Sequence, residues 1–545
     1  MGPAVRTLLL ASALIAVGSA VLADAPLDLV DLSLEELLEI EITSVSKRPQ
    51  KISRAPAAVA VVTRDDIRRS GVTSIPEALR LVPGVQVARF DANKWAISIR
   101  GFNNLFSEKL LALIDGRSVY NSMYSGVFWE IQDLLLDDVE RIEVIRGPGA
   151  TLWGANAVNG IVNVITRPAA DSQGVLVRAG FGNEERGNLS LRYGGRTGDD
   201  LHYRFFAKYF DRDAFAYPSG DPADDAWHAS RAGFRLDWTP DGQSLSLQGD
   251  LYECDQSELL ELAAVEPPYG NDLVANPIIT GGFLLGRWER ALSAVSDLKL
   301  QLYYSRTHGD DEQLMDGLYE EFDVDFQHRL RYGERQEIVW GGEYHLTWDR
   351  LVSDFALQFD PPRRTHHLFS GFVQNDLELI PDRLRLTLGS KFEHNTFSNF
   401  EVQPGARLLW TPYQSHTAWG AVSRAVRTPV RADHHMRYVR QVLPPDALAP
   451  DTPVTFVMPM GNSDFVAEEV ISCELGYRLQ PSDRLFFDLA TFYSFYDGLR
   501  IYEPGLPFYA ENPPPPHLVL PLYQTNGIFG TTWGGRVGDR LAGAR

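Results

Sequence analysis

Basic residues are scarce in this 545-residue chain, in which 51 Lys and Arg against 72 Asp and Glu give a formal net charge of -21. A nucleic-acid partner requires clustered positive charge to neutralise its phosphates, so this balance excludes that class of partner. Cysteine is even scarcer, with only Cys254 and Cys473. Cys473 lies on an alternating apolar face, which predicts a small hydrophobic side chain on a strand and no structural disulfide.

The chain also lacks, beyond its N-terminus, any run of the roughly 18 uncharged apolar residues that a spanning helix requires. The run TLLLASALIAVG after Arg6 is shorter, and Val21-Leu22-Ala23 follows it with small residues suited to cleavage before Asp24. These features predict a signal peptide over 1–23 and export from the cytoplasm. If the mature protein enters a membrane, it must therefore do so as strands.

Glycine, by contrast, is concentrated in ERIEVIRGPGATLWGANAVNGIVNVITR at 140–167, where Gly147, Gly149 and Gly154 lie between two apolar runs. A phosphate-binding loop would end in Gly-Lys-Ser/Thr and open a helix, and neither feature is present. The β-branched run that follows predicts strand, tight turn and strand.

From about residue 174 onward, apolar and polar residues alternate, as in LHYRFFAKYF at 201–210. This two-residue period predicts strands with one apolar face, a feature that the strands of a soluble β-sandwich also have. The lengths of the connections distinguish these two folds, because the connections at 213–226, 255–281 and 426–466 are long and the intervening ones are short. Short turns on one rim and long loops on the other predict a transmembrane antiparallel β-barrel, with about fifteen strands in this chain.

Residues 47–168 differ in character, with short helices predicted over Asp65–Ser70 and Ser74–Val82 and strands elsewhere, as in a small mixed α/β unit. The unit contains ISIRGF, LALIDGR, DVERIEVIRGP and WGANAVNGIVNVITR in that order, and SRAVRTP follows at 423–429. With these motifs, nearly the whole mature chain resembles a TonB-dependent outer-membrane receptor. The resemblance implies a plug domain at 47–168 and, at 172–545, about 15–16 strands of a 22-stranded barrel pattern.

The same resemblance implies a function. We expect a monomer in the outer membrane of a Gram-negative bacterium that imports a scarce ligand, most often an iron-siderophore complex, with energy from the TonB protein. We expect no catalysed reaction and no cofactor, because no Ser-His-Asp or paired-carboxylate arrangement is evident. Haem, cobalamin and sugar importers share this architecture, so the ligand stays open. A passive porin-like channel is the alternative function.

Residues 24–46 are predicted to form a periplasmic segment. Ser33 followed by Glu36 is a capping-box pattern for a short helix over Leu34 to Ile40. The β-favouring residues Ile42, Thr43, Ser44 and Val45 come next. The resemblance implies that these four form the TonB box, which would add an edge strand to a TonB sheet through backbone hydrogen bonds. A plain linker is the alternative.

The resemblance also assigns structural roles in the plug. Gly147 would turn the chain, and Gly154 would allow close backbone approach. Arg100, followed by Gly101, and Arg146, followed by Gly147, are candidates for buried ion pairs with barrel glutamates. Ordinary sheet-end arginines are the alternative interpretation.

Ligand contacts are predicted at two aromatic, turn-forming plug apices and in the longest loop. The candidate residues at the apices are Arg89, Phe90, Trp95, Tyr120, Tyr124 and Trp129, and those in the loop are Arg427, Arg431 and Arg437. An outward basic cluster favours an anionic ligand, with lipopolysaccharide contact or a solvated loop as alternatives. The histidine pairs at 366–367 and 434–435 predict no metal site, because adjacent strand residues point to opposite faces.

The end of the chain departs from the family pattern. Alternation fades in GRVGDRLAGAR after Trp533, and no terminal aromatic residue follows. About six strands of the 22-strand pattern would be missing, which would leave strand edges unpaired in hydrocarbon. We therefore expect a disrupted reading frame or a C-terminally truncated fragment that does not transport by itself.

Overall fold

The computed structural model describes residues 40–311, 315–353, 355–413, 415–482 and 485–541. The predicted signal peptide lies outside these ranges, as does the helix predicted over Leu34 to Ile40 except for its last residue, so both stay predictions. No helix within the described ranges is both long and apolar enough to cross a membrane. Both cysteines in these ranges are free, Cys254 buried and Cys473 exposed.

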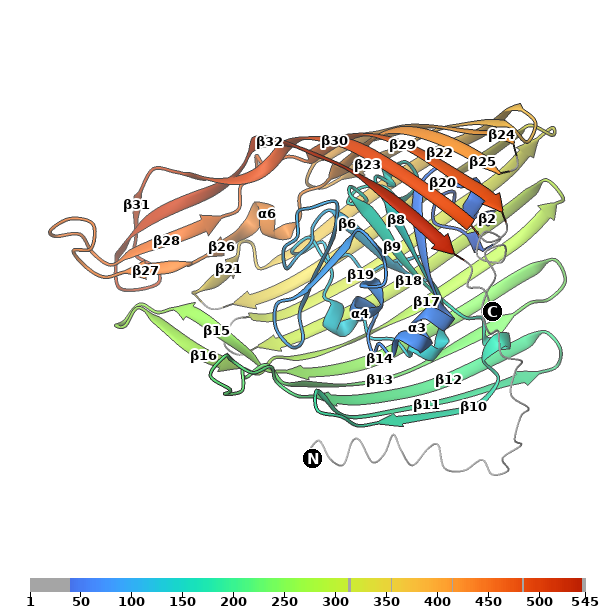
Figure 1. The fold of residues 1–545 in the computed structure, drawn as a ribbon. Coiled ribbons are helices and arrows are strands. Elements are labelled where there is room, and N and C mark those ends of the chain that lie inside the picture. The colour runs from blue at the N-terminus through green and yellow to red at the C-terminus, as the bar shows by residue number, and fades with distance from the viewer. Residues whose placement is uncertain (1–39, 312–314, 354, 414, 483–484, 542–545) are drawn as a thin grey trace. The chain divides into compact units, whose positions relative to one another are not determined.

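Residues 40–172 form an α/β part (Figure 1). Its strands are β1 (Glu41–Ile42), β2 (Gln50–Lys51), β3 (Ala58–Thr63), β4 (Val85–Arg89), β5 (Trp95–Ile99), β6 (Leu110–Ile114), β7 (Arg117–Ser118), β8 (Val139–Arg146) and β9 (Gly160–Thr166). Its helices are α3 (Arg64–Ser70), α4 (Ile75–Leu79) and α5 (Ala150–Trp153), with 3-10 turns η1 (Ile52–Arg54), η2 (Trp129–Ile131), η3 (Leu136–Asp138) and η4 (Ala169–Ser172). Five of these strands form a sheet in the order β3-β8-β9-β6-β7.

Local sequence explains where α3 begins and ends. The Thr63 hydroxyl accepts a hydrogen bond from the Asp66 amide (3.2 Å), and the Asp66 carboxylate accepts one from the Thr63 amide (2.9 Å). This reciprocal capping satisfies two otherwise unpaired donors. Gly71 ends the helix in the left-handed region at a φ of 69°, which glycine adopts without steric cost.

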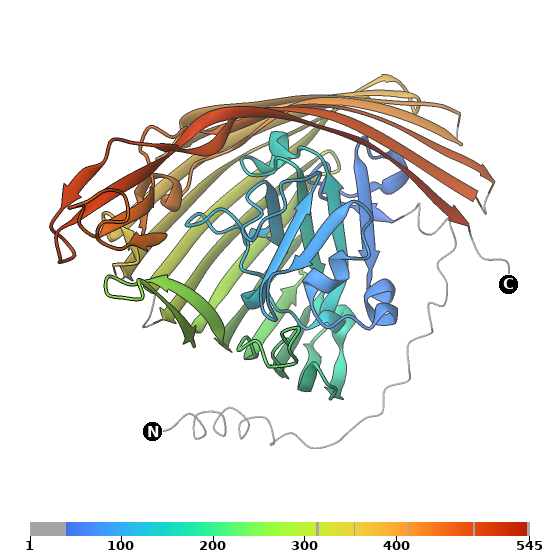
Figure 2. The same cartoon turned by 60° about the vertical axis from the view of Figure 1, so that its left-hand side comes forward.

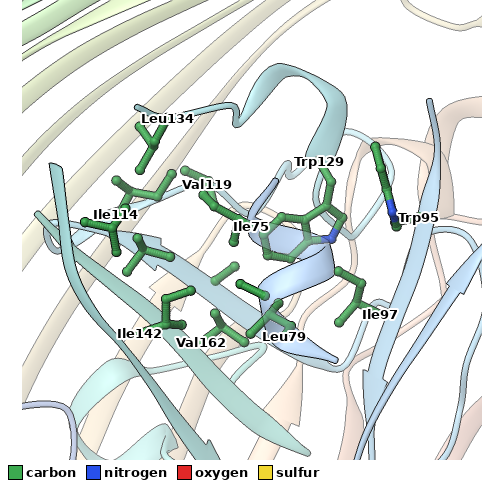
Figure 3. Close-up of a cluster of buried hydrophobic side chains, with 14 of the residues drawn as sticks. Ile75, Leu79, Trp95, Ile97, Ile114, Val119, Trp129, Leu134, Ile142 and Val162 are labelled. Atoms are coloured by element: carbon green, nitrogen blue, oxygen red, sulfur yellow. The ribbon is translucent and has the colours of Figure 1, made fainter. Parts of the chain in front are cut away.

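The core of the α/β part lies between its five-stranded sheet and α4. Ile75 and Leu79 of α4 pack against sheet residues such as Ile142 and Val162 (Figure 3). The same cluster continues onto the large sheet through Phe210, which is fully buried. The hydrophobic contacts therefore join the two parts of the chain in one core.

The rest of the described chain forms a 21-stranded sheet that runs from β10 to β32 (Figure 2). Its long strands are β10 (Gly174–Gly180), β11 (Glu185–Thr197), β12 (Leu201–Arg212), β13 (Trp227–Trp238), β14 (Gln243–Gln256), β17 (Ile278–Ser293), β18 (Ser296–Asp311), β19 (Met315–Tyr332), β20 (Gln336–Ser353), β22 (Arg363–Ile380), β23 (Leu384–Asn395), β24 (Asn399–Tyr413), β25 (His416–Arg427), β29 (Glu468–Ser482), β30 (Leu485–Pro504) and β32 (His517–Leu541). These strands pair antiparallel with their neighbours, as the alternating pattern predicts.

Short elements belong to the long connections. They are the strands β21 (Leu357–Phe359), β26 (Met436–Tyr438), β27 (Gln441–Leu443), β28 (Thr455–Met460) and β31 (Phe508–Ala510), the hairpin of β15 (Glu258–Ala263) and β16 (Gly270–Ala275), and helix α6 (Arg431–His435). Setting aside the five short strands of the 21-stranded sheet leaves sixteen long ones in the described residues. The predicted sheet class and its size are therefore confirmed.

The longest connections lie at one edge of the sheet, as predicted, although residues 396–398 join β23 to β24 by a short turn at that same edge. Residues 333–335 alone join β19 to β20, whereas residues 428–467 separate β25 from β29. We call these two edges the short-turn rim and the long-loop rim. Although alternation fades after Trp533, β32 continues to Leu541 and pairs with β30 from Leu522 to Leu541. Backbone pairing does not require alternating side chains, so polar residues extend the strand.

Candidate functional site

The segment Ile42 to Val45 is buried against the rest of the α/β part. Ile42 lies in β1, which pairs with β2, and both Ile42 and Val45 are almost fully buried. The Glu143 carboxylate accepts hydrogen bonds from the Thr43 amide (3.0 Å), the Ser44 amide (2.9 Å) and the Ser44 hydroxyl (2.6 Å). The Trp153 indole donates to the Ser44 carbonyl oxygen (2.6 Å). We call this set of bonds the latch.

The latch predicts that Glu143 controls exposure of the segment. In Glu143→Gln, an amide replaces a carboxylate that accepts from three donors of the segment and from Arg141 Nε (2.8 Å). Each hydrogen bond to a charged group contributes about 1.5–3 kcal/mol. We expect the Thr43 and Ser44 amides to exchange hydrogen at least about tenfold faster, equivalent to about 1.4 kcal/mol, as measured by mass spectrometry. Glu140→Gln is the matched control, because Glu140 lies on the same strand with its side chain 43% exposed. Equal exchange in both variants would contradict the latch.

Two basic residues directly after this segment attach it to the large sheet. The Lys47 ammonium lies 3.2 Å from Asp325 on β19 and 4.6 Å from the centroid of the Phe372 ring. Arg48 forms ion pairs with Glu337 on β20 (3.0 Å) and Asp376 on β22 (3.4 Å). We call Lys47 and Arg48 the strap. Its partners lie on three strands near the short-turn rim.

Buried ion pairs fasten the α/β part to the large sheet elsewhere too. Arg100 pairs with Glu474 of β29, and both side chains are more than nine-tenths buried. Lys109 lies 2.6 Å from Glu468, which also accepts from Arg427 (2.9 Å). Breaking one partner of a buried pair costs about 3–5 kcal/mol, so these contacts resist separation of the two parts.

In the described structure, Arg146 does not form the ion pair with a barrel glutamate that was expected from the sequence. It donates to the Pro83 carbonyl oxygen (3.2 Å), and in the described part of the chain its Nε and Nη2 have no hydrogen-bond partner. Burial lowers the pKa of Arg146 to about 10, which still leaves it charged near neutral pH.

The predicted structural glycines all have positive φ angles. They are Gly101 (97°), Gly147 (123°) and Gly154 (85°). A Cβ on Gly147 would lie 2.8 Å from Arg100 Nη1, and one on Gly154 would lie 2.8 Å from Lys391 Nζ. Side chains at Gly147 and Gly154 would therefore displace the ends of these charged side chains, and the positive φ would strain any residue other than glycine.

The predicted apex residues do not form one surface. Trp95 and Trp129 are buried in the core of the α/β part (Figure 3), so the placement of these two at an outer apex is wrong. Both rings pack in the same cluster as Ile75 and Leu79 of α4, and the Trp95 indole donates to Glu77 of that helix (2.9 Å). Phe90 is 72% exposed. Arg89 is paired with Glu184 (2.5 Å).

The remaining apex aromatics, Tyr120 and Tyr124, belong to different hydrophobic clusters. Tyr120 is buried, and its hydroxyl donates to the Glu108 carbonyl oxygen (3.1 Å). The half-buried Tyr124 ring lies 5.5 Å from Phe106 and 5.9 Å from Phe359 of β21. We call the surrounding group the outer cluster, which comprises Met123, Tyr124, Met315, Tyr319, Leu351, Leu357, Phe359, Val430, Ala432, Met436 and Tyr438. Sequence reasoning missed most of these residues, because they come from separate strands and connections with no shared motif.

The basic cluster of the longest loop is largely neutralised. Arg427 is fully buried between Asp433 (2.7 Å) and Glu468 (2.9 Å), and Arg431 is buried against Asp349 (3.2 Å). The expectation that both guanidinium groups face outward is therefore wrong, because carboxylates from neighbouring segments pair with them. Arg437 alone among the three is exposed, with 46% of its side chain accessible beside Asp360 (3.0 Å).

The electrostatics of α6 follow from these contacts. Burial opposes ionisation of Asp433, yet Arg427 and Arg500 lower the pKa of its carboxyl below the usual value. Burial and Arg364 lower the pKa of His435 to about 4. The His435 imidazole is therefore neutral near neutral pH, and its Nε2 accepts from Arg364 (2.6 Å).

Three histidines gather around Phe397. The Phe397 ring centroid lies 4.0 Å from His366, 4.9 Å from His434 and 6.1 Å from His435. His367 lies on the opposite face of β22, where it contacts Tyr344 (3.0 Å). Within the described ranges, no group of three or more ligating side chains is arranged to hold a metal ion.

A cavity of about 150 Å³ lies between the α/β part and strands β18 to β23. We call it the lateral cavity. Lys47, Trp153 and Asp325 line its short-turn end, and Thr347, His366 and Phe397 line the other. Charges near the short-turn end are compensated, since Lys391 lies 2.8 Å from Glu343 and His345 lies 3.2 Å from Asp323.

The sequence matches two family models. One, described as the TonB-dependent receptor plug domain, matches residues 51–161, and the other, described as the TonB dependent receptor-like β-barrel, matches 173–532, more than half of the chain. The chain belongs to the TonB-dependent receptor family. The α/β part is the plug and the large sheet is the barrel. The family is one of outer-membrane receptors of Gram-negative bacteria and not of enzymes.

Solved receptors share this fold. The siderophore receptor PirA of Acinetobacter baumannii superposes with a TM-score of 0.71 at 17% identity, covering 89% of this chain and 78% of that one. The ferric enterobactin receptor PfeA of Pseudomonas aeruginosa, solved as a variant in complex with enterobactin, gives 0.69 at 18% identity, with 88% and 78% covered.

Curated relatives match a shorter stretch. The vitamin B12 transporter BtuB of Vibrio cholerae is 31% identical over 163 residues, which is 30% of this chain and 26% of that protein. The match thus spans about a quarter of the length of the relative. The predicted limits of the periplasmic segment, plug and barrel at 24–46, 47–168 and 172–545 stay predictions.

Proposed function

We propose that this protein imports a scarce small ligand, foremost an iron-siderophore complex, across the outer membrane with energy supplied through TonB. The observation that carries the proposal is the set of buried ion pairs between plug and barrel, including Arg100 with Glu474 and Lys109 with Glu468. Thermal motion rarely breaks such contacts, since each costs several kcal/mol to separate. An external pull on the plug therefore fits the structure better than passive diffusion.

Ile42 to Val45 supply the proposed point of attachment for TonB. The segment is extended at β1, and its Thr43 and Ser44 amides are bonded to one carboxylate only. Strand addition by a partner would replace these bonds with backbone pairs. The box would then have to leave the latch before TonB engages it.

The outer cluster supplies the proposed ligand surface. Its aromatic and methionine side chains come from a plug apex, from β19 and from barrel connections. Arg437 adds an exposed positive charge nearby on β26. Aromatic faces with a positive charge suit an anionic, aromatic chelate. PirA and PfeA are named as siderophore and ferric enterobactin receptors, which favours iron chelates. BtuB is named as a vitamin B12 transporter, so cobalamin is the second candidate.

Growth rescue tests the proposal. Iron-starved cells with or without this gene would receive catecholate, hydroxamate and carboxylate ferric siderophores or haem singly, and a cobalamin auxotroph would receive cobalamin. We expect growth on at least one ferric siderophore only when both the gene and an intact TonB are present. Rescue that persists without TonB would favour the porin-like alternative. Absence of rescue on every source would favour a non-functional fragment.

A further inference from the structure

The long-loop end of the lateral cavity carries polar atoms without protein partners. Thr347 of β20 and His366 of β22 are cross-strand neighbours with 2% and 9% of their surfaces exposed. In the described structure, Thr347 Oγ1 and both His366 ring nitrogens have no hydrogen-bond partner. An unmade buried hydrogen bond costs about 1–3 kcal/mol, so these atoms fit a guest that both donates and accepts hydrogen bonds.

The short-turn end of the same cavity is closed by groups tied to the TonB box. Lys47 lines the cavity, and its ammonium lies 5.0 Å from the Trp153 ring centroid. Trp153 also lines the cavity and donates to Ser44 of the latch. Two residues of extended chain span at most about 7 Å, so a pull on Val45 reaches Lys47 with little slack.

The opposite side of the plug is sealed. There Phe210, Trp227 and Cys254 of the barrel pack into the plug core. The cavity lined by Cys254 measures about 10 Å³, too small for more than a water-sized guest. Asp133 adds an ion pair with Lys208 (2.7 Å) on this side.

We propose that the lateral cavity is the passage for the hydrogen-bonding part of the ligand, received by Thr347 and His366, and that the strap is its floor. Pulling on Ile42 to Val45 withdraws Lys47 and Arg48 from Asp325, Glu337 and Asp376. The plug then opens toward β19 to β23 while the packed side near β12 to β14 stays closed. This proposal rests on the proposed import function.

Thiol labelling of purified protein in detergent tests the floor without TonB or ligand. Thr347→Cys in a Cys473→Ser background reports on the lateral cavity, and the native Cys254 reports on the sealed side. The probe is a small methanethiosulfonate with a quaternary ammonium group, and mass spectrometry locates the label. Asp325→Asn with Asp376→Asn removes strap partners. Lys47→Gln with Arg48→Gln removes these contacts and also the Arg48 pair with Glu337, without changing the barrel.

We expect labelling of the thiol at position 347 to rise at least about tenfold in both strap variants, equivalent to about 1.4 kcal/mol, with Cys254 unchanged. Asp133→Asn, which breaks a pair on the sealed side, should leave position 347 unchanged. Unchanged labelling at 347 in the strap variants, or an equal rise at 347 and Cys254, overturns the proposal. If labelling at position 347 does not rise but growth rescue is intact, the proposed passage is rejected and the proposed import function stands. If labelling rises as expected but growth rescue fails, the import function is rejected.

Discussion

Replacing Thr43 with proline is expected to abolish ligand uptake while leaving binding at the cell surface intact. Proline removes the backbone donor that strand addition to TonB requires, and its ring disfavours the pairing geometry. The same change removes the Thr43 hydrogen bond to Glu143 (3.0 Å), so the box is also released from the latch. Uptake and binding of the radiolabelled ferric siderophore identified by growth rescue provide the measurement.

Two variants separate loss of coupling from loss of the latch. Thr43→Ala keeps the backbone donor and should import as the parent does. Glu143→Gln weakens the latch but leaves every donor of the box in place, so uptake should persist. Unchanged uptake in the proline variant would show that Ile42 to Val45 are a plain linker.

Replacing Arg427 with serine is expected to lower the free energy of unfolding by about 3 kcal/mol, because it removes one buried cation from Asp433 and Glu468. The two carboxylates keep their pairs with Arg500 and Lys109. Arg437→Ser removes an exposed pair worth about 0–1 kcal/mol and should leave stability nearly unchanged. The measurement is urea unfolding of the refolded protein in lipid vesicles, followed by tryptophan fluorescence.

Ligand binding is expected to depend on Arg437 and not directly on Arg427, which is the reverse of the order expected for stability. Arg437→Ser should weaken binding of an anionic chelate without affecting assembly, whereas Arg427→Ser should affect binding only as far as it unfolds the loop. The reverse pattern, with stable Arg427→Ser protein that has lost affinity, would return Arg427 to the ligand surface. This comparison replaces the sequence-based expectation that Arg427, Arg431 and Arg437 act alike.

Much of the candidate site could not be predicted from the sequence, because the residues that contact one another there lie far apart along the chain. Lys47 and Asp325 are 278 residues apart, and neither neighbourhood contains a motif that points to the other. Trp95 and Trp129 looked like apex residues because turns flank them, yet packing beside α4 buries both. The sequence of an aromatic turn does not reveal whether its ring faces solvent or core.

The sequence by itself determined the fold class and the family, because alternation, turn length and ordered motifs are local properties. The tertiary structure alone decided which charges are neutralised, since Arg427 and Arg431 are paired with carboxylates from other segments. It also decided that Thr347 and His366 share one wall of a cavity. Strand register sets such neighbours, and register depends on pairing between segments that the linear pattern does not specify.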